Sequence, residues 1–119
     1  MSDSRQQAED HYYAALDFFA EGKHDQAVAA YEKCLELDPC HSEALHGLAR
    51  AYQDANRFDE SIQISKRLVE LDPDDILAHT SLSIAYQKKG MIPEAEAAAN
   101  QARILGWKKQ LREGKDKSF

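Results

Sequence analysis

Long apolar stretches are missing from this sequence of 119 residues. The first ten residues, MSDSRQQAED, are polar, which argues against a secretory signal, and no later segment approaches the length needed to span a membrane. Cysteine is also scarce, with 2 residues in unmatched settings, which favours a reducing compartment. We therefore expect a cytoplasmic protein without membrane insertion.

Motifs of known catalytic chemistry are missing as well. The sequence has no glycine-rich phosphate loop, no His-Glu-x-x-His helix and no Gly-x-Ser-x-Gly nucleophile motif. Paired acids such as Asp74 and Asp75 stand at expected helix starts, where carboxylates complement the helix dipole. We expect no enzymatic activity and no cofactor, and an enzyme would need a partner to supply the chemistry.

Positive charge is in short supply over most of the chain. Residues 1–102 contain 9 Lys or Arg against 19 Asp or Glu, a net charge of −10. Residues 103–119 contain 6 Lys or Arg against 2 Asp or Glu, a net charge of +4. The acidic body argues against nucleic acid as a partner, because phosphates favour basic surfaces. The basic end is typical of a solvated helix terminus, and an electrostatic docking tag is the alternative.

The stretch CLELDPCHSEALH places two cysteines and two histidines close together, at Cys34, Cys40, His41 and His46. Their spacing matches no usual zinc pattern, which pairs ligands two to four residues apart. The corresponding stretch further along, RLVELDPDDILAH, keeps its pattern without sulfur. We expect no metal, a buried Cys34 on a helix, and no disulfide, because Cys40 falls in the loop after a proline.

A regular internal repeat runs through the chain. The letters ELDP occur at 36–39 and again at 70–73, so the two prolines are 73 − 39 = 34 residues apart. When the chain is written in rows of 34 residues that start at Ala8, the rows agree column by column. Small residues share the eighth and twentieth columns, and leucine fills the thirtieth, as in Ala15, Ala49 and Ser83, in Ala27, Ser61 and Ala95, and in Leu37, Leu71 and Leu105. A fixed period of this size indicates a repeat architecture.

Each row predicts two helices. In the first row, apolar residues recur at helical spacing before Gly22 and again from His24 to Leu37, where Asp38 and Pro39 end the second helix. The other rows repeat this pattern, which predicts six helices of about 11 to 14 residues and no strand.

The turns carry their own signals. Asn56 and Gly90 occupy the short turns within the second and third rows, because both tolerate the left-handed conformation. After the proline loop of the first row, Ser42 is the expected N-cap of the next helix.

These rows resemble the tetratricopeptide repeat (TPR) family, whose unit is a helix-turn-helix of about 34 residues. The third row matches the family through Leu82, Ser83, Tyr86, Gly90, Ala95 and Ala102. The resemblance covers residues 8 to about 109. It departs from the family pattern at the fourth column, where the usual aromatic is replaced by His11, Leu45 and His79.

The resemblance implies an all-α fold, a right-handed α-solenoid of three TPR units plus a capping helix. The expected domains are a polar extension at 1–7, a repeat domain at 8–109 with units 8–41, 42–75 and 76–109, and an amphipathic cap with a basic, disordered tail at 107–119. Because a stacked repeat needs a cover at its end, we expect Trp107 and Leu111 to pack on Ala95, Ala99 and Ala102.

In proteins similar to this one, the first helices of successive repeats line a concave groove that receives a peptide. The positions that match the groove columns of the family are Glu9, Tyr12, Leu16, Phe19, Glu43, His46, Arg50, Gln53, Leu77, Thr80, Ile84, Gln87 and the adjacent Lys88. The resemblance therefore predicts a non-enzymatic interaction module or adaptor that binds a peptide or helical segment.

Within this groove, Tyr12, Leu16 and Phe19 are the expected apolar anchors, on a face that the core between repeats does not need. The alternative is that polar N-terminal residues or a partner subunit cover them. One subclass of the family binds acidic chaperone tails through a clamp of Lys and Asn. The clamp positions here are Tyr12, Leu16, Gly47, Leu77 and Ser81, so only Arg50 and Lys88 remain as inward cations.

A second function class stays open. In a self-assembling scaffold, the acidic N-terminal body of one copy would meet the basic C-terminal end of another, and the chain would form homo-oligomers. The head-to-tail geometry of a solenoid permits open filaments or rings.

Overall fold

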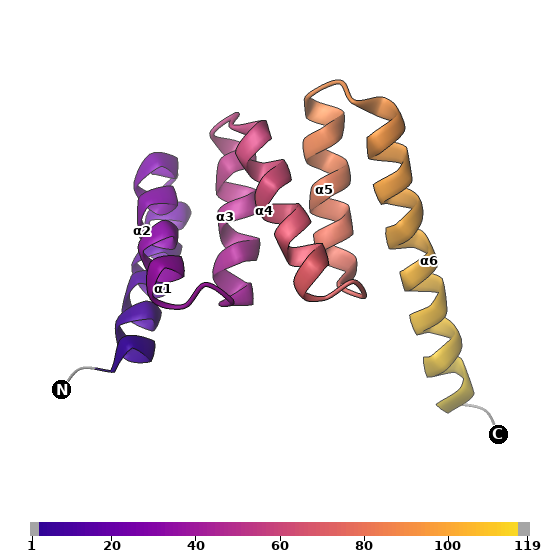
Figure 1. Ribbon diagram of the computed structural model, residues 1–119, viewed down its shortest axis with the longest axis horizontal. Helices are drawn as coiled ribbons and strands as arrows, with labels where there is room; N and C mark the ends of the chain where they lie inside the picture. Colours follow the sequence, from indigo (N-terminus) through magenta and orange to yellow (C-terminus); the bar gives the residue numbers. More distant parts are fainter. Residues whose placement is uncertain (1–2, 117–119) are drawn as a thin grey trace.

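The computed structural model describes residues 3–116, and all of the regular structure in this range is helical. The helices are α1 (Ser4–Ala20), α2 (His24–Leu37), α3 (Ser42–Asp54), α4 (Phe58–Leu71), α5 (Ile76–Lys88) and α6 (Ile92–Asp116) (Figure 1). They form three consecutive pairs, as the repeat period predicts. The first helix starts at Ser4, so it includes the end of the segment expected as a polar extension.

Short turns join the two helices of each pair, and each turn contains one residue with positive φ. These residues are Gly22, Asn56 and Gly90, at φ of 75°, 61° and 83°. Glycine adopts this conformation without steric cost, and asparagine tolerates it better than other residues. The predicted turn positions are therefore confirmed.

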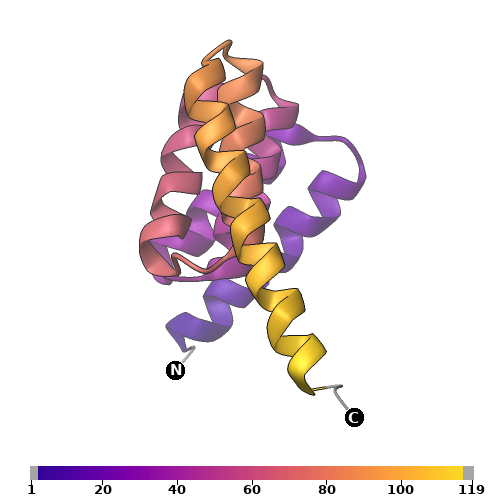
Figure 2. The same cartoon turned by 90° about the vertical axis from the view of Figure 1, so that its right-hand side faces the viewer.

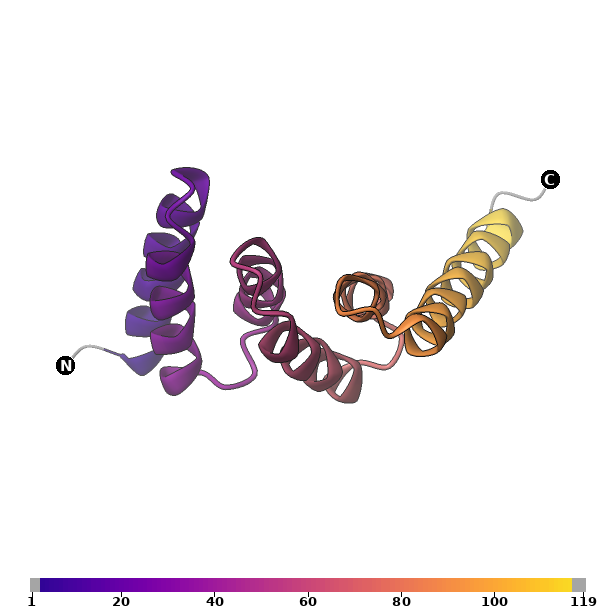
Figure 3. The same cartoon turned by 90° about the horizontal axis from the view of Figure 1, so that it is seen from above.

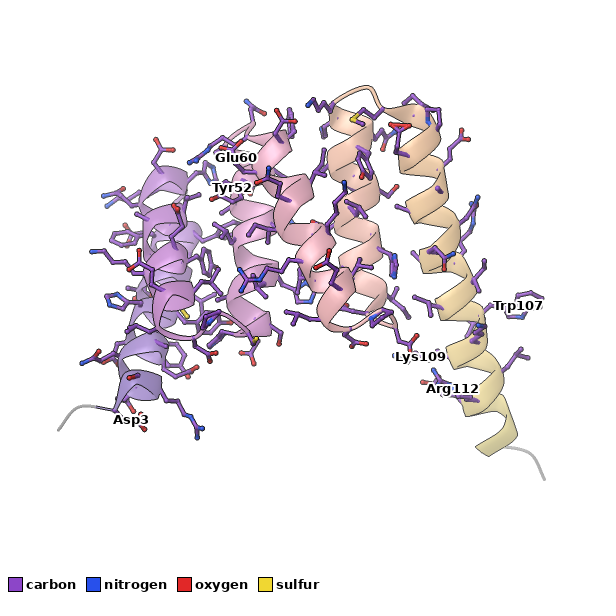
Figure 4. All side chains as sticks on the ribbon, viewed as in Figure 1. Asp3, Tyr52, Glu60, Trp107, Lys109 and Arg112 are labelled. Atoms are coloured by element: carbon purple, nitrogen blue, oxygen red, sulfur yellow. The ribbon has the colours of Figure 1, made fainter. Side chains whose placement is uncertain are left out.

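The α3–α4 turn is further held by side chains. The guanidinium of Arg57 lies over the ring of Tyr52 at 4.7 Å from its centroid, and its Nε donates a hydrogen bond of 2.7 Å to Glu60. Tyr52 and Glu60 lie together at this end of the molecule (Figure 4).

The residue before the first helix of the second and third repeats caps that helix. Nδ1 of His41 accepts a hydrogen bond of 3.1 Å from the Ala44 amide, and the Asp75 carboxylate accepts one of 3.2 Å from the Ala78 amide. The prediction that Ser42 is the N-cap is therefore wrong by one residue. An imidazole nitrogen can satisfy the free N–H of a first turn as a carboxylate does.

Small side chains allow the two helices of a repeat to cross closely. Ala15 and Ala27 are fully buried at the crossing of α1 and α2. In the next two crossings a serine hydroxyl donates to the carbonyl of the facing alanine, from Ser61 to Ala49 at 2.9 Å and from Ser83 to Ala95 at 2.8 Å. The eighth and twentieth columns are small because they meet each other.

The second helix of each repeat packs against the first helix of the next. Val28 and Tyr31 of α2 form a buried cluster with residues of α3 that include Leu48 and Tyr52. One unit later, Ile62 of α4 forms a cluster with Ala85 and Tyr86 of α5. A side chain at Gly47 would place its Cβ 2.5 Å from the Tyr31 ring, so this contact requires glycine.

The stacked pairs form a curved array. The backbone of α1 approaches that of α3, and the backbone of α3 approaches that of α5, whereas within residues 3–116 the backbones of α2 and α4, and those of α4 and α6, lie further apart. Seen from above, α3 and α5 lie on the inner side of the curve and α4 and α6 on the outer side (Figure 3). The first helices therefore face the inside of the array, as the resemblance implies.

The last helix departs from the predicted lengths. It runs for 25 residues without a break at Gly106, and its C-terminal half projects past the other helices (Figure 2). The expected C-terminal helix is therefore the continuation of α6, and residues 117–119 of the expected tail lie outside the described range. The expected contact of this segment with Ala95, Ala99 and Ala102 is wrong, because Trp107 and Leu111 are 66% and 57% exposed.

The two cysteines lie in different surroundings, and neither forms a disulfide. Cys34 is fully buried in the cluster between α2 and α3, whereas Cys40 is exposed in the loop. No group of three or more potential metal ligands occurs among the described residues. Burial, with the charges of Asp38 and Glu9, raises the pKa of the Cys34 thiol to about 11.

The two thiols should therefore differ in reactivity. Only a thiolate attacks a disulfide reagent, so at pH 8 the folded protein should release colour from Ellman's reagent at Cys40 alone. Both thiols should react after unfolding in guanidinium, and the Cys40→Ser variant should be unreactive until it unfolds. Equal rates for the two thiols in the folded protein would contradict the burial of Cys34.

A pair of glycine substitutions tests the packing between repeats. Gly47→Ala should destabilise the fold by about 1 to 3 kcal/mol, because the new Cβ overlaps the buried Tyr31 ring. Gly106→Ala, also inside a helix but with open space around its Cβ, should stabilise it by about 0.5 to 1 kcal/mol. Urea unfolding measures the stability of both variants. If the two substitutions change the stability equally, the contact with Tyr31 is not tight.

Candidate functional site

The inner side of the array divides into side chains that hold the repeats together and side chains that remain free. Of the thirteen positions that the sequence places in the groove, several make contacts within the protein. The free ones gather on α3 and α5, and Leu16 of α1 joins them.

At the N-terminal end, Glu9 belongs to the first group. Its carboxylate lies 2.6 Å from Nε2 of His41, whose Nδ1 caps α3. The imidazole therefore links α1 to the start of the next repeat. The Tyr12 ring lies 5.0 Å from the His41 ring and 6.3 Å from the ring of Tyr31. Burial, together with the nearby Glu43 and Glu9, raises the pKa of Tyr12.

The three expected anchors are not equally available. Tyr12 and Phe19 are partly buried and pack against the cluster between the first two repeats, and Phe19 also contacts His24 edge-on at 6.1 Å. Only Leu16, at 40%, is widely exposed. The expectation that the core does not need this face is therefore wrong for Tyr12 and Phe19.

Three groove residues of the second and third repeats are also engaged. Nε2 of His46 lies 2.6 Å from the Asp75 carboxylate, and the Gln53 side chain donates to the Ser81 carbonyl at 3.2 Å. Both contacts connect α3 with the third repeat. Thr80 donates its hydroxyl to the Ile76 carbonyl of its own helix at 3.0 Å. The contacts of His46 and Gln53 therefore help to keep α3 and α5 in register, whereas the Thr80 bond lies within α5.

Some predicted residues of α3 and α5 line an open hollow of about 510 Å³ between the C-terminal ends of these helices. It brings together four of them with three further residues, and its lining consists of Arg50, Gln53, Asp54, Asn56, Phe58, Ile84 and Lys88. Nε of Arg50 donates to Asp54 at 3.3 Å, yet 67% of the Arg50 side chain stays exposed. Ile84 is 38% exposed, and Lys88 is exposed one turn further on. The hollow thus offers two cations beside an aliphatic side chain.

Glu43, Leu77 and Gln87 lie outside this hollow. Leu77 is 57% exposed near the start of α5, and Glu43 and Gln87 are exposed as well. Asp54, Asn56 and Phe58 line the hollow without having been predicted, and the last two belong to the turn after α3 and to α4. The positive φ of Asn56 directs the chain back over the end of α3, and this signal was present in the sequence.

None of the helices in the described part of the chain is both long enough and apolar enough to cross a lipid bilayer.

Comparison with known proteins agrees with this architecture. A protein-family model described as tetratricopeptide repeat matches residues 18–83, which is more than half of the chain. A curated relative, the putative cargo-transport protein ypp1 of Schizosaccharomyces pombe, is 35% identical over 63 residues. That match covers 53% of this chain and 7% of the relative, so the chain spans a small part of the relative's length.

Solved structures are similar in fold. The crystal structure of MamA has a TM-score of 0.84 at 24% identity, with 91% of this chain and 63% of that chain covered. The first TPR of Spaghetti (RPAP3), bound to the HSP90 peptide SRMEEVD, has a TM-score of 0.80 at 22% identity, with 85% and 80% covered. These similarities show the predicted fold class, a right-handed α-solenoid of helix-turn-helix units. With the matched family model, they lead to one conclusion: the chain belongs to the tetratricopeptide repeat family.

Proposed function

We propose that the inner surface of this array binds a peptide segment that carries a carboxylate next to an aliphatic side chain. The protein acts as a non-catalytic interaction module, an adaptor for such segments. The observation that carries the proposal is the hollow between α3 and α5, where Arg50 and Lys88 flank Ile84.

The charges in the hollow favour an acidic ligand. Asp54 engages Arg50 at one nitrogen only, and a guanidinium has five N–H donors, so further donors remain for a ligand carboxylate. No described residue pairs with the Lys88 ammonium. A ligand with one carboxylate between these two side chains therefore gains charge-assisted hydrogen bonds.

Apolar contacts would extend the site along the groove. Ile84 lies in the hollow, and Leu77 and Leu16 are exposed on α5 and α1. Aliphatic groups at such positions bury area that is otherwise in water, at about 25 cal/mol per Å². Tyr12, Phe19, His46 and Thr80 take a supporting role in this proposal, since their internal contacts fix the shape of the groove floor.

The proposed site differs from the clamp of Lys and Asn with which one subclass of the family binds acidic chaperone tails. The Spaghetti domain holds the peptide SRMEEVD, which ends in an acidic and aliphatic run. This chain has Leu16, Gly47 and Leu77 at clamp positions. We infer a peptide of similar chemistry with a different mode of binding, centred on Arg50 and Lys88.

Selection from a random heptapeptide library tests the proposal. Peptides retained by the wild type should be enriched in Asp or Glu next to Leu, Ile or Val. A double variant, Arg50→Glu with Lys88→Glu, should bind a selected peptide at least about tenfold more weakly, because two attractions become repulsions. Isothermal titration calorimetry measures the affinity.

Glu32→Lys is the matched control. Glu32 is exposed on the second helix of the first repeat, so reversal of its charge should leave the affinity unchanged. If the double variant binds the selected peptides as well as the wild type does, the hollow is not the binding site.

A further inference from the structure

The two ends of the array present surfaces that the groove does not use. In the second and third repeats, the residues in the seventh and eleventh columns pack against the second helix of the preceding repeat. Leu48 and Tyr52 do so on α3, and Leu82 and Tyr86 on α5. Within residues 3–116 no helix precedes α1, so its residues in these columns form an end face.

This end face is hollowed and mainly apolar at its centre. Ala14 and Phe18 occupy the two columns, and with residues of α2 they surround an open hollow of about 230 Å³. Its lining consists of His11, Ala14, Phe18, Gln26, Ala29, Ala30 and Lys33. Tyr13 extends the apolar surface and is 57% exposed.

Acidic residues flank the N-terminal end face. In the later repeats the third and tenth columns are filled by fully buried alanines, Ala44 and Ala51 on α3 and Ala78 and Ala85 on α5. On α1 the same columns hold Asp10 and Asp17, both exposed. Residues 10, 14 and 17 share one side of a helix, so the two carboxylates lie along the apolar centre.

The opposite end of the array presents an apolar stripe on the projecting half of α6. Ile104, Trp107 and Leu111 are spaced by three and four residues and are 42%, 66% and 57% exposed. Trp107 points away from the other helices (Figure 4). A stripe of this kind, on a helix that extends past its neighbours, is left largely exposed to solvent.

Basic residues flank this stripe. Between residues 103 and 112 the chain has Arg103, Lys108, Lys109 and Arg112 and no acid. An open hollow of about 350 Å³ beside the α4–α5 loop is lined by Asp74, Leu105, Lys108, Leu111 and Arg112. The two ends are therefore alike in having an apolar centre, and most of the charges around them are opposite in sign, with Lys33 at the N-terminal hollow and Asp74 at the C-terminal one as exceptions.

We propose that the projecting half of α6 of one copy packs on the α1–α2 end face of a second copy. The stripe of Ile104, Trp107 and Leu111 covers the hollow at Ala14 and Phe18, and Lys108 and Arg112 face Asp10 and Asp17. The contact joins two different surfaces, so it leaves a free end on each copy and builds open chains. It covers a small area, which places it among weak associations.

A second copy fits the stripe better than a lipid surface does. A basic stripe with tryptophan also suits an anionic membrane, but residues 1–102 carry a net charge of −10, which such a surface repels. The chain itself supplies a face with the complementary charge. Neither end contains Arg50, Ile84 or Lys88, so this proposal and the groove proposal stand or fall separately.

Charge exchange between the two ends tests the proposal. Sedimentation velocity of the full chain from about 10 μM to 1 mM should show an average mass that rises from 13.4 kDa beyond that of a dimer. Asp10→Lys with Asp17→Lys, and Lys108→Glu with Arg112→Glu, should each keep the protein at monomer mass. The variant with all four changes should assemble again, because its attractions are restored with reversed signs.

Trp107 is the only tryptophan, so its emission reports on the stripe. Its maximum should shift to shorter wavelength as the wild type assembles, and circular dichroism should show that every variant is folded. The proposal is overturned if the wild type stays a monomer at 1 mM, if either double variant assembles as the wild type does, or if the fourfold variant stays monomeric. Sedimentation of a monomeric wild type with vesicles of phosphatidylserine and phosphatidylcholine would assign the stripe to lipid.

Discussion

The ring of Tyr31 lies against the backbone of Gly47, and the distance between the first two repeats depends on this contact. A second helix has more apolar surface than its own partner helix can cover, so it must pack on the first helix of the next repeat. The same need recurs one unit later, where Ile62 packs with Tyr86. Because α3 and α5 are each held between two second helices, the array curves and keeps them on its inner side (Figure 3). The fold is thus a chain of nearest-neighbour contacts.

The proposed binding function depends on the side chains that these contacts between repeats leave exposed. Polar groups such as His41 with Glu9 and His46 with Asp75 connect one repeat to the next through hydrogen bonds within the protein. Groups with unused hydrogen-bonding capacity remain where the first helices end, at Arg50 and Lys88. A surface that is rigid because its neighbours are packed loses little entropy when a ligand binds, which favours affinity from few contacts. The ends of the array follow the same logic, since within residues 3–116 each end lacks a neighbouring helix on one side.

Much of the fold could be predicted from the repeat period, which places Gly22, Asn56 and Gly90 at turns and small residues at crossings. The site was harder to predict. A column gives the side of a helix on which a residue lies, but not how far the neighbouring repeat reaches, and so Tyr12 and Phe19 were expected to be free. The length of α6 was not predicted for a different reason, since a separate capping helix was expected after the third repeat. Gly106 stops a helix only in a left-handed conformation, and the following residues, KKQLRE, favour helix, so α6 continues through it.

We propose that ligands bind on the inner side, between α3 and α5. Titration of the ¹⁵N-labelled protein with a heptapeptide that contains adjacent glutamate and leucine tests it most directly, because each backbone amide reports separately. We expect the amide signals near Arg50, Ile84 and Lys88 to shift together while those of α2 and α4 stay in place. Shifts that gather on the outer helices, or that leave α3 and α5 unchanged, would contradict it.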